Sequence, residues 1–331
     1  MQRLQDRAAR LCAQHGEHAP GQPVLAAISG GIDSTALLLV LQRLAEAGRL
    51  PGPLHIVHVD HGIRPERREV AARVEDHCDR FDLPVHVRRL DPPPVRTDAD
   101  SLRNARYSLF AAVARSLDAR LLLTAHHADD NVETVLFRML RGTGVRGLAG
   151  IPQARALGPR LVVLRPFLKT RRVTLERLLD RFDLAPCDED PTNQDLRYSR
   201  NALRHETIPA LREKLGVGID ATLLTVARTA TAAVEILEAQ GQRLRLDWGA
   251  RITPWRHELQ FPEEEPLVAP FLETALRQIW SEIRTQGSPP PRTWLERATA
   301  LAGGGFGQRV AGRGGELLVE RTRSGLLVVD P

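Results

Sequence analysis

Short aliphatic runs alternate with longer stretches of helical periodicity over the first two-thirds of the sequence. The runs predict strands at Val24–Ile28, Leu54–Val59, Pro84–Arg88, Arg120–Leu123 and Leu161–Leu164. The longer stretches predict helices at Ser34–Ala47, Pro65–Phe81, Ser101–Leu117, Asp129–Leu140 and Thr170–Phe182. This alternation predicts an α/β fold, a parallel doubly wound sheet with helices on both faces. Ligands of such sheets bind at the carboxyl ends of the strands, so the residues after each run are the candidates for chemistry.

The pattern changes near residue 215. One long helix is expected from Asp220 to about Leu246, followed by the loop FPEEEPLVAP and a helix at Leu267–Ile283. Two turn signals, Gly314-Gly315 and Ser324-Gly325, then separate the short apolar runs of a small meander. We therefore expect two domains, a catalytic domain at residues 1–215 and a smaller α+β domain at residues 216–331.

The composition excludes several classes of protein. Hydrophobic residues make up 42% and charged residues 26% of the 331 residues, which is too apolar for a disordered chain. No apolar run reaches the ~18 residues of a membrane span, and the N-terminus lacks the apolar core of a secretory signal. Cys12, Cys78 and Cys187 are far apart and form no CxxC pair. We therefore expect a cytoplasmic protein with neither a disulfide framework nor a cysteine zinc site.

The distribution of charge is more informative than its total. The net charge is +5, and the segment from Arg138 to Arg172 carries nine basic residues and no Asp or Glu. Such a segment repels itself unless an anion lies nearby, and nucleic acid or nucleotide phosphate is the natural candidate. A solvated basic surface is the alternative.

The clearest motif follows the first predicted strand. It consists of Ser29, Gly30, Gly31, Ile32, Asp33 and Ser34, and a helix begins at once. Two glycines let the backbone approach a bulky anion, and the amides of the loop and of the helix N-terminus then point at that anion. The motif matches neither GxxxxGK[ST] nor GxGxxG. The alternative is a tight turn with a serine cap.

The hexapeptide SGGIDS resembles the pyrophosphate loop (PP-loop) of the N-type ATP pyrophosphatases. Further segments follow in order: HVDHGIRPE, SLRNARYSLF, TAHHADDNVETVLFRMLRGTGVRGLAGI, RPFL and EDPTNQDLRYSRNALRHETIP. Together they resemble the tRNA(Ile)-lysidine synthetases over about residues 20–210. One departure is Thr192, where the family usually has Ser. The resemblance is weaker through the meander, which is similar to the family's first C-terminal domain, and we expect the second C-terminal domain of longer members to be absent.

The resemblance implies an adenine nucleotide alpha hydrolase-like fold and a two-step ligation. ATP, with Mg²⁺, adenylates the oxygen at position 2 of the wobble cytidine in the isoleucine tRNA with a CAU anticodon. The ε-amine of free L-lysine then displaces AMP and leaves lysidine. The family also implies an enzyme without a membrane partner, and a homodimer is compatible with it.

The resemblance and the residue chemistry together indicate catalytic residues Asp33, Arg106, Asp130 and Glu133. ATP would contact the SGGIDS loop together with His58 and Asp60, which follow the second strand. Asp130 and Glu133 are i and i+3 in the first turn of a helix, so they share a face and can hold the lysine ammonium. We expect no dedicated metal site, although Asp33 and Asp130 can supply carboxylates to Mg²⁺. Carboxylates that merely complement the helix dipole are the alternative.

Two groups of arginines are expected at the tRNA. Arg141 and Arg146 come from the basic segment, while Arg197, Arg200 and Arg204 recur on one face of a later helix. A basic helical face is typical of contact with an RNA backbone. For the adjacent His126 and His127, a catalytic base and a helix-leading polar pair are both open.

Three rival functions fit the sequence less well. A tRNA 2-thiolation enzyme needs catalytic cysteines, and the cysteines here lack partners. A metallo-β-lactamase-like zinc site would need a histidine where Ile56 stands before His58, Asp60 and His61. A non-catalytic tRNA-binding module would not need the carboxylates after the strands.

Overall fold

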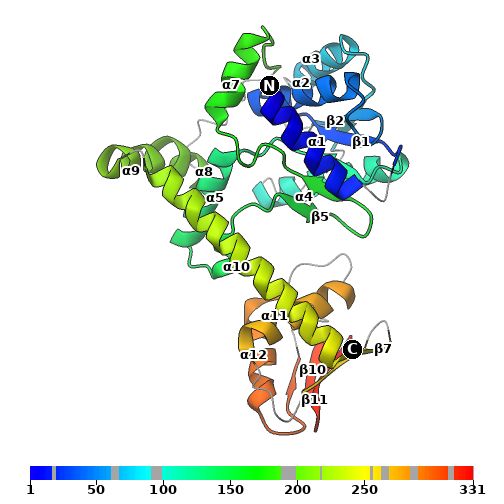
Figure 1. Ribbon diagram of the computed structural model, residues 1–331, viewed down its shortest axis with the longest axis vertical. Coiled ribbons are helices and arrows are strands. Elements are labelled where there is room, and N and C mark those ends of the chain that lie inside the picture. The colour runs from blue at the N-terminus through cyan, green and yellow to red at the C-terminus, as the bar shows by residue number, and fades with distance from the viewer. Residues whose placement is uncertain are drawn as a thin grey trace. The chain divides into compact units, whose positions relative to one another are not determined.

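The computed structural model of the protein (Figure 1) describes residues 1–16, 20–60, 67–90, 99–187, 199–216, 218–253, 256–261, 268–283, 290–311 and 317–330. Two compact units, Met1–Ala227 and Arg228–Pro331, make up the chain. The long helix α10 (Ile219–Trp248) contributes residues to both. Among the described residues, no single helix is long and apolar enough to span a membrane, and one bent pair of helices meets that test by length and composition only.

A six-stranded sheet forms the centre of the first unit. Its strands are β1 (Val24–Ala27), β2 (Leu54–Asp60), β3 (Val85–Arg89), β4 (Leu121–Leu123), β5 (Ala154–Ala156) and β6 (Val162–Leu164). Their order is β3-β2-β1-β4-β6-β5, and only the edge strand β5 runs antiparallel to its neighbour. The five predicted parallel strands are thus confirmed. The strand β5 was not predicted, because its sequence ARA is short, largely exposed and has no apolar run.

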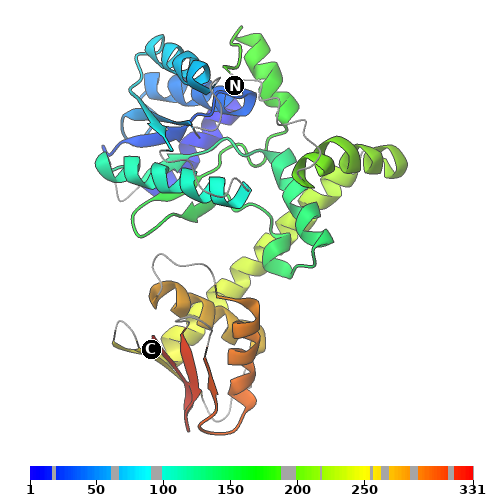
Figure 2. The same cartoon turned by 180° about the vertical axis from the view of Figure 1, so that it is seen from behind.

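Helices cover both faces of this sheet. The helices of the first unit are α1 (Gln2–Gly16), α2 (Ile32–Glu46), α3 (Arg67–Asp79), α4 (Ala99–Ser116), α5 (Ala128–Leu140), α6 (Val145–Leu148), α7 (Arg172–Arg181), α8 (Ser199–Ala202) and α9 (Ile208–Leu215), with a π-helical turn at Leu203–Thr207. Of these, α1, α2, α3 and α7 pack on one face and α4 on the other, whereas α5, the π-helical turn and α9 pack with α10 in a separate cluster. Figure 2 shows α4 (cyan) on the face of the sheet opposite to α2 (blue). The doubly wound α/β fold is therefore confirmed. The sequence interpretation missed α1, whose apolar residues are interrupted by many charged ones.

Alternate residues along each strand point to opposite faces of the sheet. Val24, Ala26 and Ile56 pack with α1, α2 and α7, whereas Leu25 and Val57 pack with α4. Successive side chains of a strand point to opposite faces, so strands buried on both sides read as continuous apolar runs. The central strand β1 lies between β2 and β4, and the crossovers depart from it in opposite directions. That switch point, at the carboxyl ends of β1 and β4, is where ligands of open α/β sheets bind.

The second unit is a small α+β domain, as expected. Its antiparallel sheet has the order β7-β8-β11-β10-β9, with β7 (Gly249–Thr253), β8 (Arg256–Gln260), β9 (Arg309–Val310), β10 (Leu318–Arg321) and β11 (Gly325–Val329). Helices α11 (Ala269–Ile283) and α12 (Arg292–Ala300) pack on it, with Trp280 and Trp294 in edge-to-face contact. The predicted meander corresponds to β9–β11. The hairpin β7–β8 and helix α12 were not predicted, because their short polar stretches carry little periodicity.

Candidate active site

The SGGIDS loop joins β1 to α2. Gly30 has φ +96°, a conformation that only glycine adopts without strain. The Ser34 hydroxyl accepts hydrogen bonds from the amides of Ser29 (3.2 Å) and Gly30 (3.1 Å) and donates to the carbonyl of Gly31 (2.9 Å). Ser34 therefore shapes the loop, and the first-turn amides of α2 are left to face a ligand because they have no intrahelical acceptor.

A second connection fixes the loop from outside. The amide of Cys187 donates to the carbonyl of Gly30 at 2.7 Å, and the Cys187 thiol lies 3.2 Å from Nδ1 of His77 on α3. Thr35 adds a weaker hydrogen bond to the same carbonyl. The Gly30 carbonyl is thus held from two sides, by Thr35 on α2 and by Cys187 after α7, and this keeps the backbone of the turn close to where an anion would lie.

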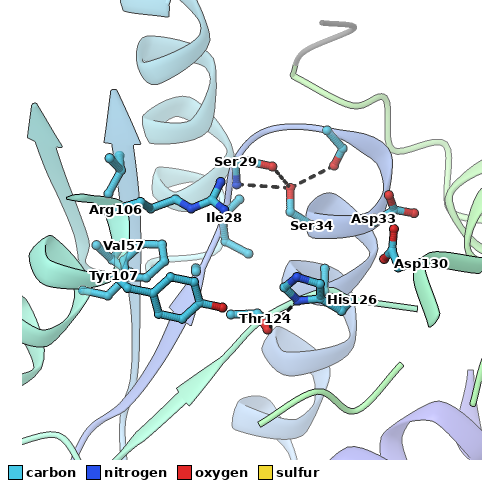
Figure 3. Close-up of a pocket in the computed structure, with 15 residues that line it drawn as sticks. Ile28, Ser29, Asp33, Ser34, Val57, Arg106, Tyr107, Thr124, His126 and Asp130 are labelled. Carbon is cyan, nitrogen blue, oxygen red and sulfur yellow. Dashed lines mark hydrogen bonds between the residues drawn. The ribbon is translucent and has the colours of Figure 1, made fainter. Parts of the chain in front are cut away.

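A cavity of about 260 Å³ opens beside the loop at the carboxyl ends of β1 and β4 (Figure 3). Val57, Val59 and Phe110 give it an apolar wall on the α4 side of the sheet. The remaining lining residues are Ala27, Ile28, Ser29, Gly31, Asp33, Ser34, Arg106, Tyr107, Thr124, Ala125, His126 and Asp130. An apolar wall facing a phosphate-type loop and a carboxylate pair suits a nucleotide with its base and its phosphates at opposite ends.

His127 lies between two acidic residues of the site, Asp33 on α2 and Asp130 on α5. It is the N-cap of α5, where its Nδ1 accepts from the amide of Asp130 at 3.3 Å and its own amide donates to the Asp130 carboxylate at 2.9 Å. Since Nδ1 is an acceptor, the proton of the neutral ring is on Nε2. That atom lies 3.5 Å from carboxylate oxygens of both Asp33 and Asp130. His127 therefore has the helix-leading role, and a role as a catalytic base stays a hypothesis.

The charge state of His127 follows from these neighbours. Its side chain is only 1% exposed, and this burial disfavours the imidazolium. The carboxylates of Asp33, Asp130 and Asp129 outweigh the burial and raise the pKa of His127 above 6.5. When protonated, the ring offsets repulsion between the acids that converge from α2 and α5; its Nδ1, 3.7 Å from Asp129, then no longer accepts from the Asp130 amide.

Asp130 and Glu133 share one face of α5, as their spacing predicted. Arg204 binds both: its Nε donates to Glu133 at 2.6 Å, and its terminal nitrogen donates to Glu133 at 3.0 Å and to Asp130 at 3.1 Å. Glu133 is 4% exposed, and burial raises its pKa in spite of the arginine. The carboxylate pair therefore holds a cationic nitrogen group in this conformation, and the cation comes from the π-helical turn Leu203–Thr207.

The first turn of α5 contains only two acids, Asp129 and Asp130, so the expectation that Glu133 also belongs to it was wrong: Glu133 follows in the second turn. Asp129 has a structural role. It accepts from the amide of Arg172 at 2.8 Å and pairs with Arg171 at 2.7 Å. These bonds prevail over the effect of its burial and lower the pKa of Asp129. Arg171 also pairs with Asp220 at 2.7 Å, so the start of α5 is fastened to the start of α7 and to α10.

Of the other residues expected to bind ATP or act in catalysis, Arg106 lines the cavity, whereas His58 and Asp60 do not. Arg106 reaches from α4 toward the SGGIDS loop and lines the cavity. His58 and Asp60 are buried on β2, with parity opposite to that of the lining residues Val57 and Val59. The His58 ring donates from Nδ1 to the carbonyl of Ile28 at 2.8 Å. Contacts of these two residues with ATP stay a prediction, and the strand parity favours their backbone over their side chains.

The basic segment is not one continuous surface. Arg138 donates to the carbonyls of Gly147 and Gly150, Arg160 pairs with Asp118, and Arg165 is buried. Arg141 is exposed at the end of α5 with its guanidinium over Phe137, and Arg146 is partly exposed on α6. The expected tRNA contacts of Arg141 and Arg146 stay predictions.

Several expected positions cannot be placed. His61, Thr192 and Arg197 lie outside the described residues, and for Arg200 only the backbone, in α8, is described. Arg204 was expected at the tRNA, yet its guanidinium lies on the acidic pair, and its contact with tRNA is untested.

The sequence interpretation did not name Tyr107 or Thr124 as site residues, and it left the role of His126 open. Tyr107, Thr124 and His126 line the cavity, and the His126 Nδ1 lies 3.0 Å from the Thr124 hydroxyl. The sequence did carry a signal for them: Thr124 and His126 come directly after β4, and Tyr107 follows Arg106 on α4.

The described residues contain no group of three or more His, Cys, Asp or Glu side chains arranged to hold a metal ion. The site nevertheless suits Mg²⁺ that arrives with a nucleotide. One oxygen of Asp33 is buried and has no hydrogen-bond partner in the described part of the chain, and Asp130 lies across His127 from it. Mg²⁺ commonly takes one or two carboxylates and completes its shell with phosphate and water.

The model of the PP-loop domain family matches residues 2–211. The tRNA(Ile)-lysidine synthase of Novosphingobium aromaticivorans is 35% identical over 310 residues, which is 91% of this chain and 88% of that protein. The enzyme of the same name from Salinispora arenicola is 35% identical over 93% of this chain and 91% of that protein. The chain belongs to the tRNA(Ile)-lysidine synthase family. The resemblance inferred from the motifs is thereby confirmed.

Other family members are longer. The tRNA(Ile)-lysidine synthase of Pseudomonas fluorescens is 40% identical over 83% of this chain, but the match spans 58% of that protein. Among solved structures, the U34-tRNA thiolase NcsA from Methanococcus maripaludis is similar with a TM-score of 0.54 at 14% identity, covering 70% of this chain and 78% of that one. At this identity the likeness shows the fold alone. In the protein described here, Cys12, Cys78 and Cys187 are all buried, and none of them lines the cavity.

A pH dependence of stability follows from the raised pKa of His127. Stabilisation of the imidazolium is fully present below about pH 6.5, the unfolded value, and disappears as the pH rises through the folded value. His127→Asn keeps a good N-cap residue and removes the titration. The unfolding free energy, measured with urea, should therefore differ most between wild type and His127→Asn at low pH.

Repeating the measurement in the Asp33→Asn background supplies the control. Removing one of the raising carboxylates should shrink the low-pH difference. A difference that is flat with pH, or larger at high pH, would contradict the charge state derived for His127.

Proposed function

We propose that the protein is an ATP-dependent carbon–nitrogen ligase that forms lysidine in an isoleucine tRNA with a CAU anticodon. The observation that carries this proposal is the junction of the SGGIDS loop with the acidic pair Asp130 and Glu133 through His127. The loop suits a nucleotide phosphate, and the acidic pair suits an amine. Membership of the tRNA(Ile)-lysidine synthase family supports the choice of tRNA and lysine.

In the first step the oxygen at position 2 of the cytidine attacks the α-phosphorus of ATP, and pyrophosphate leaves. The first-turn amides of α2 hold the phosphates, and Arg106 supplies a fixed positive charge beside them. The apolar wall of Val57, Val59 and Phe110 receives the adenosine and excludes water. In the second step the bound lysine ε-ammonium gives up one proton to solvent, and the free ε-amine attacks carbon 2. AMP leaves with the electrons of the broken carbon–oxygen bond, and the attached nitrogen then loses a second proton.

Asp33 and Asp130 would hold the Mg²⁺ that accompanies ATP. The ion supplies charge neutralisation to the phosphates when it is bound. The unpartnered oxygen of Asp33 and the exposure of Asp130 to the cavity support this role. His127 keeps the two carboxylates at similar distances from one ring nitrogen, and so fixes their orientation.

Asp130 and Glu133 bind the lysine ammonium in this proposal. Arg204 now occupies the pair, with three donor contacts between 2.6 and 3.1 Å. A lysine ammonium needs the same oxygens, so Arg204 must withdraw at least partly when lysine binds. Once withdrawn it is free to contact tRNA, together with Arg197, Arg200 and the exposed Arg141 and Arg146.

The remaining expectations belong to the same proposal. Residues 1–215 would be the catalytic domain, and residues 216–331 would contribute to tRNA binding. We further propose a cytoplasmic enzyme without a membrane partner, which can act as a homodimer.

Incubation with ATP, Mg²⁺, isotope-labelled lysine and total tRNA tests the function. The label should appear in one isoleucine tRNA, and digestion should release a labelled cytidine derivative. Label on the tRNA 3′ end, or no label in the presence of intact ATP binding, would contradict the proposal.

The lysine subsite has its own test. Glu133→Gln removes one charge-assisted hydrogen bond to the ammonium, a loss of ~1.5–3 kcal/mol, so the KM for lysine should rise roughly tenfold to a hundredfold. The KM for ATP should change little. Equal effects on both substrates would indicate Mg²⁺ coordination, and no effect on either would leave only a helix-dipole role.

Glu176→Gln is the matched control. Glu176 on α7 also accepts from an arginine, Arg172, at 3.0 Å, but it lies on the surface and does not line the cavity. This variant should leave both KM values unchanged.

A further inference from the structure

Four arginines gather around the ring of Tyr107. Arg103 and Arg155 each place the guanidinium 5.1 Å from the ring centroid. Arg165 interacts with the Tyr107 hydroxyl, and Arg106 is its chain neighbour on α4. We call these four residues the Tyr107 arginine cluster. They come from α4, from the edge strand β5 and from the segment after β6, so the fold brings together residues that are up to 62 positions apart.

No carboxylate compensates this cluster in the described part of the chain. Arg165 is 1% exposed, and its Nη1 donates to the carbonyl of Pro152 at 2.7 Å. Burial and the charges of Arg155 and Arg103 lower the pKa of Arg165, and burial with Arg103 lowers that of Arg106. By contrast, Arg171 and Arg204 pair with carboxylates. A group of positive charges without a carboxylate partner attracts an anion, and Arg103 and Arg155 are the members of the cluster that an anion from outside can reach.

Tyr107 places the cluster at the edge of the cavity. The tyrosine is 6% exposed, it lines the cavity, and its hydroxyl has no hydrogen bond of good geometry in the described residues. Arg106 also lines the cavity, whereas Arg103 and Arg155 do not. Arg155 is exposed and Arg103 partly so. These two guanidinium groups therefore face whatever part of a ligand projects beyond the cavity.

We propose that Arg103 and Arg155 bind a phosphodiester of the RNA substrate next to the nucleotide that enters the cavity. This inference rests on the proposed function and adds a phosphate subsite to it. A guanidinium matches a phosphate with two parallel hydrogen bonds, and stacking on Tyr107 orients both groups before binding. The phosphates of ATP have their own site at the amides of α2, inside the cavity, which leaves the outer pair of arginines to the RNA backbone.

The test compares Arg103→Ala, Arg155→Ala and the double variant with wild type. Binding of a fluorescently labelled isoleucine tRNA transcript with a CAU anticodon is measured by anisotropy over a range of salt concentrations. Each substitution should weaken RNA binding and reduce the log–log salt slope by ~0.7–0.9. Binding of a non-hydrolysable ATP analogue, measured by calorimetry, should stay unchanged.

Arg43→Ala is the matched control. Arg43 also lies over an aromatic ring, that of Phe182 at 5.8 Å, but it is in the last turn of α2 and pairs with Glu46. The loss of this charge should leave the RNA slope unchanged. A second pair of variants keeps the test valid if an alanine variant unfolds. Arg155→Lys keeps the charge and should retain the wild-type salt slope of RNA binding, whereas Arg155→Gln removes the charge and should reduce that slope.

The outcomes separate the two proposals. An unchanged salt slope in the double variant overturns the phosphodiester subsite, even when wild type forms lysidine. A loss of ATP-analogue affinity as large as the loss of RNA affinity also overturns it, because the cluster would then serve the nucleotide phosphates. Reduced slopes in a protein that forms no lysidine would support the subsite and refute the proposed function alone.

Discussion

The interaction on which the site depends is the placement of the His127 ring between Asp33 and Asp130. It joins the N-terminal turns of α2 and α5, which follow the neighbouring strands β1 and β4. Acidic side chains are favourable near each helix N-terminus, but two such turns that meet bring their carboxylates together. A buried histidine whose pKa is raised by those carboxylates reduces the repulsion. The ring thereby links the SGGIDS loop to the acidic pair Asp130 and Glu133.

Opposite charges occupy opposite sides of the cavity. Arg106 and Tyr107 line it from α4, and Asp33 and Asp130 line it from α2 and α5. An anionic substrate group is drawn to the first side and a cationic group to the second. Arg204 already shows the preference of the acidic side, because its guanidinium contacts Asp130 and Glu133 there. A reaction that uses a nucleotide, an RNA and an amine fits this polarity.

The sequence predicted the parallel sheet and the loop because both depend on local signals. Aliphatic runs such as that of Val24–Ile28 mark strands buried on both faces, and Gly30 and Gly31 mark the turn. The edge strand β5 was missed because ARA carries no such run. The contacts of Arg204 and Arg155 were also beyond prediction, since each depends on partners far along the chain. Helical spacing placed Arg204 on a basic face, but tertiary packing turned it toward Glu133.

The account is tested most directly by isotope exchange between labelled pyrophosphate and ATP. If the SGGIDS loop and the His127 junction support adenylation of a tRNA base, exchange should require the isoleucine tRNA and Mg²⁺ but proceed without lysine. Adding lysine should convert the reaction to net release of AMP and pyrophosphate. Exchange in the absence of tRNA, or cleavage of ATP to ADP and phosphate, would contradict the central claim.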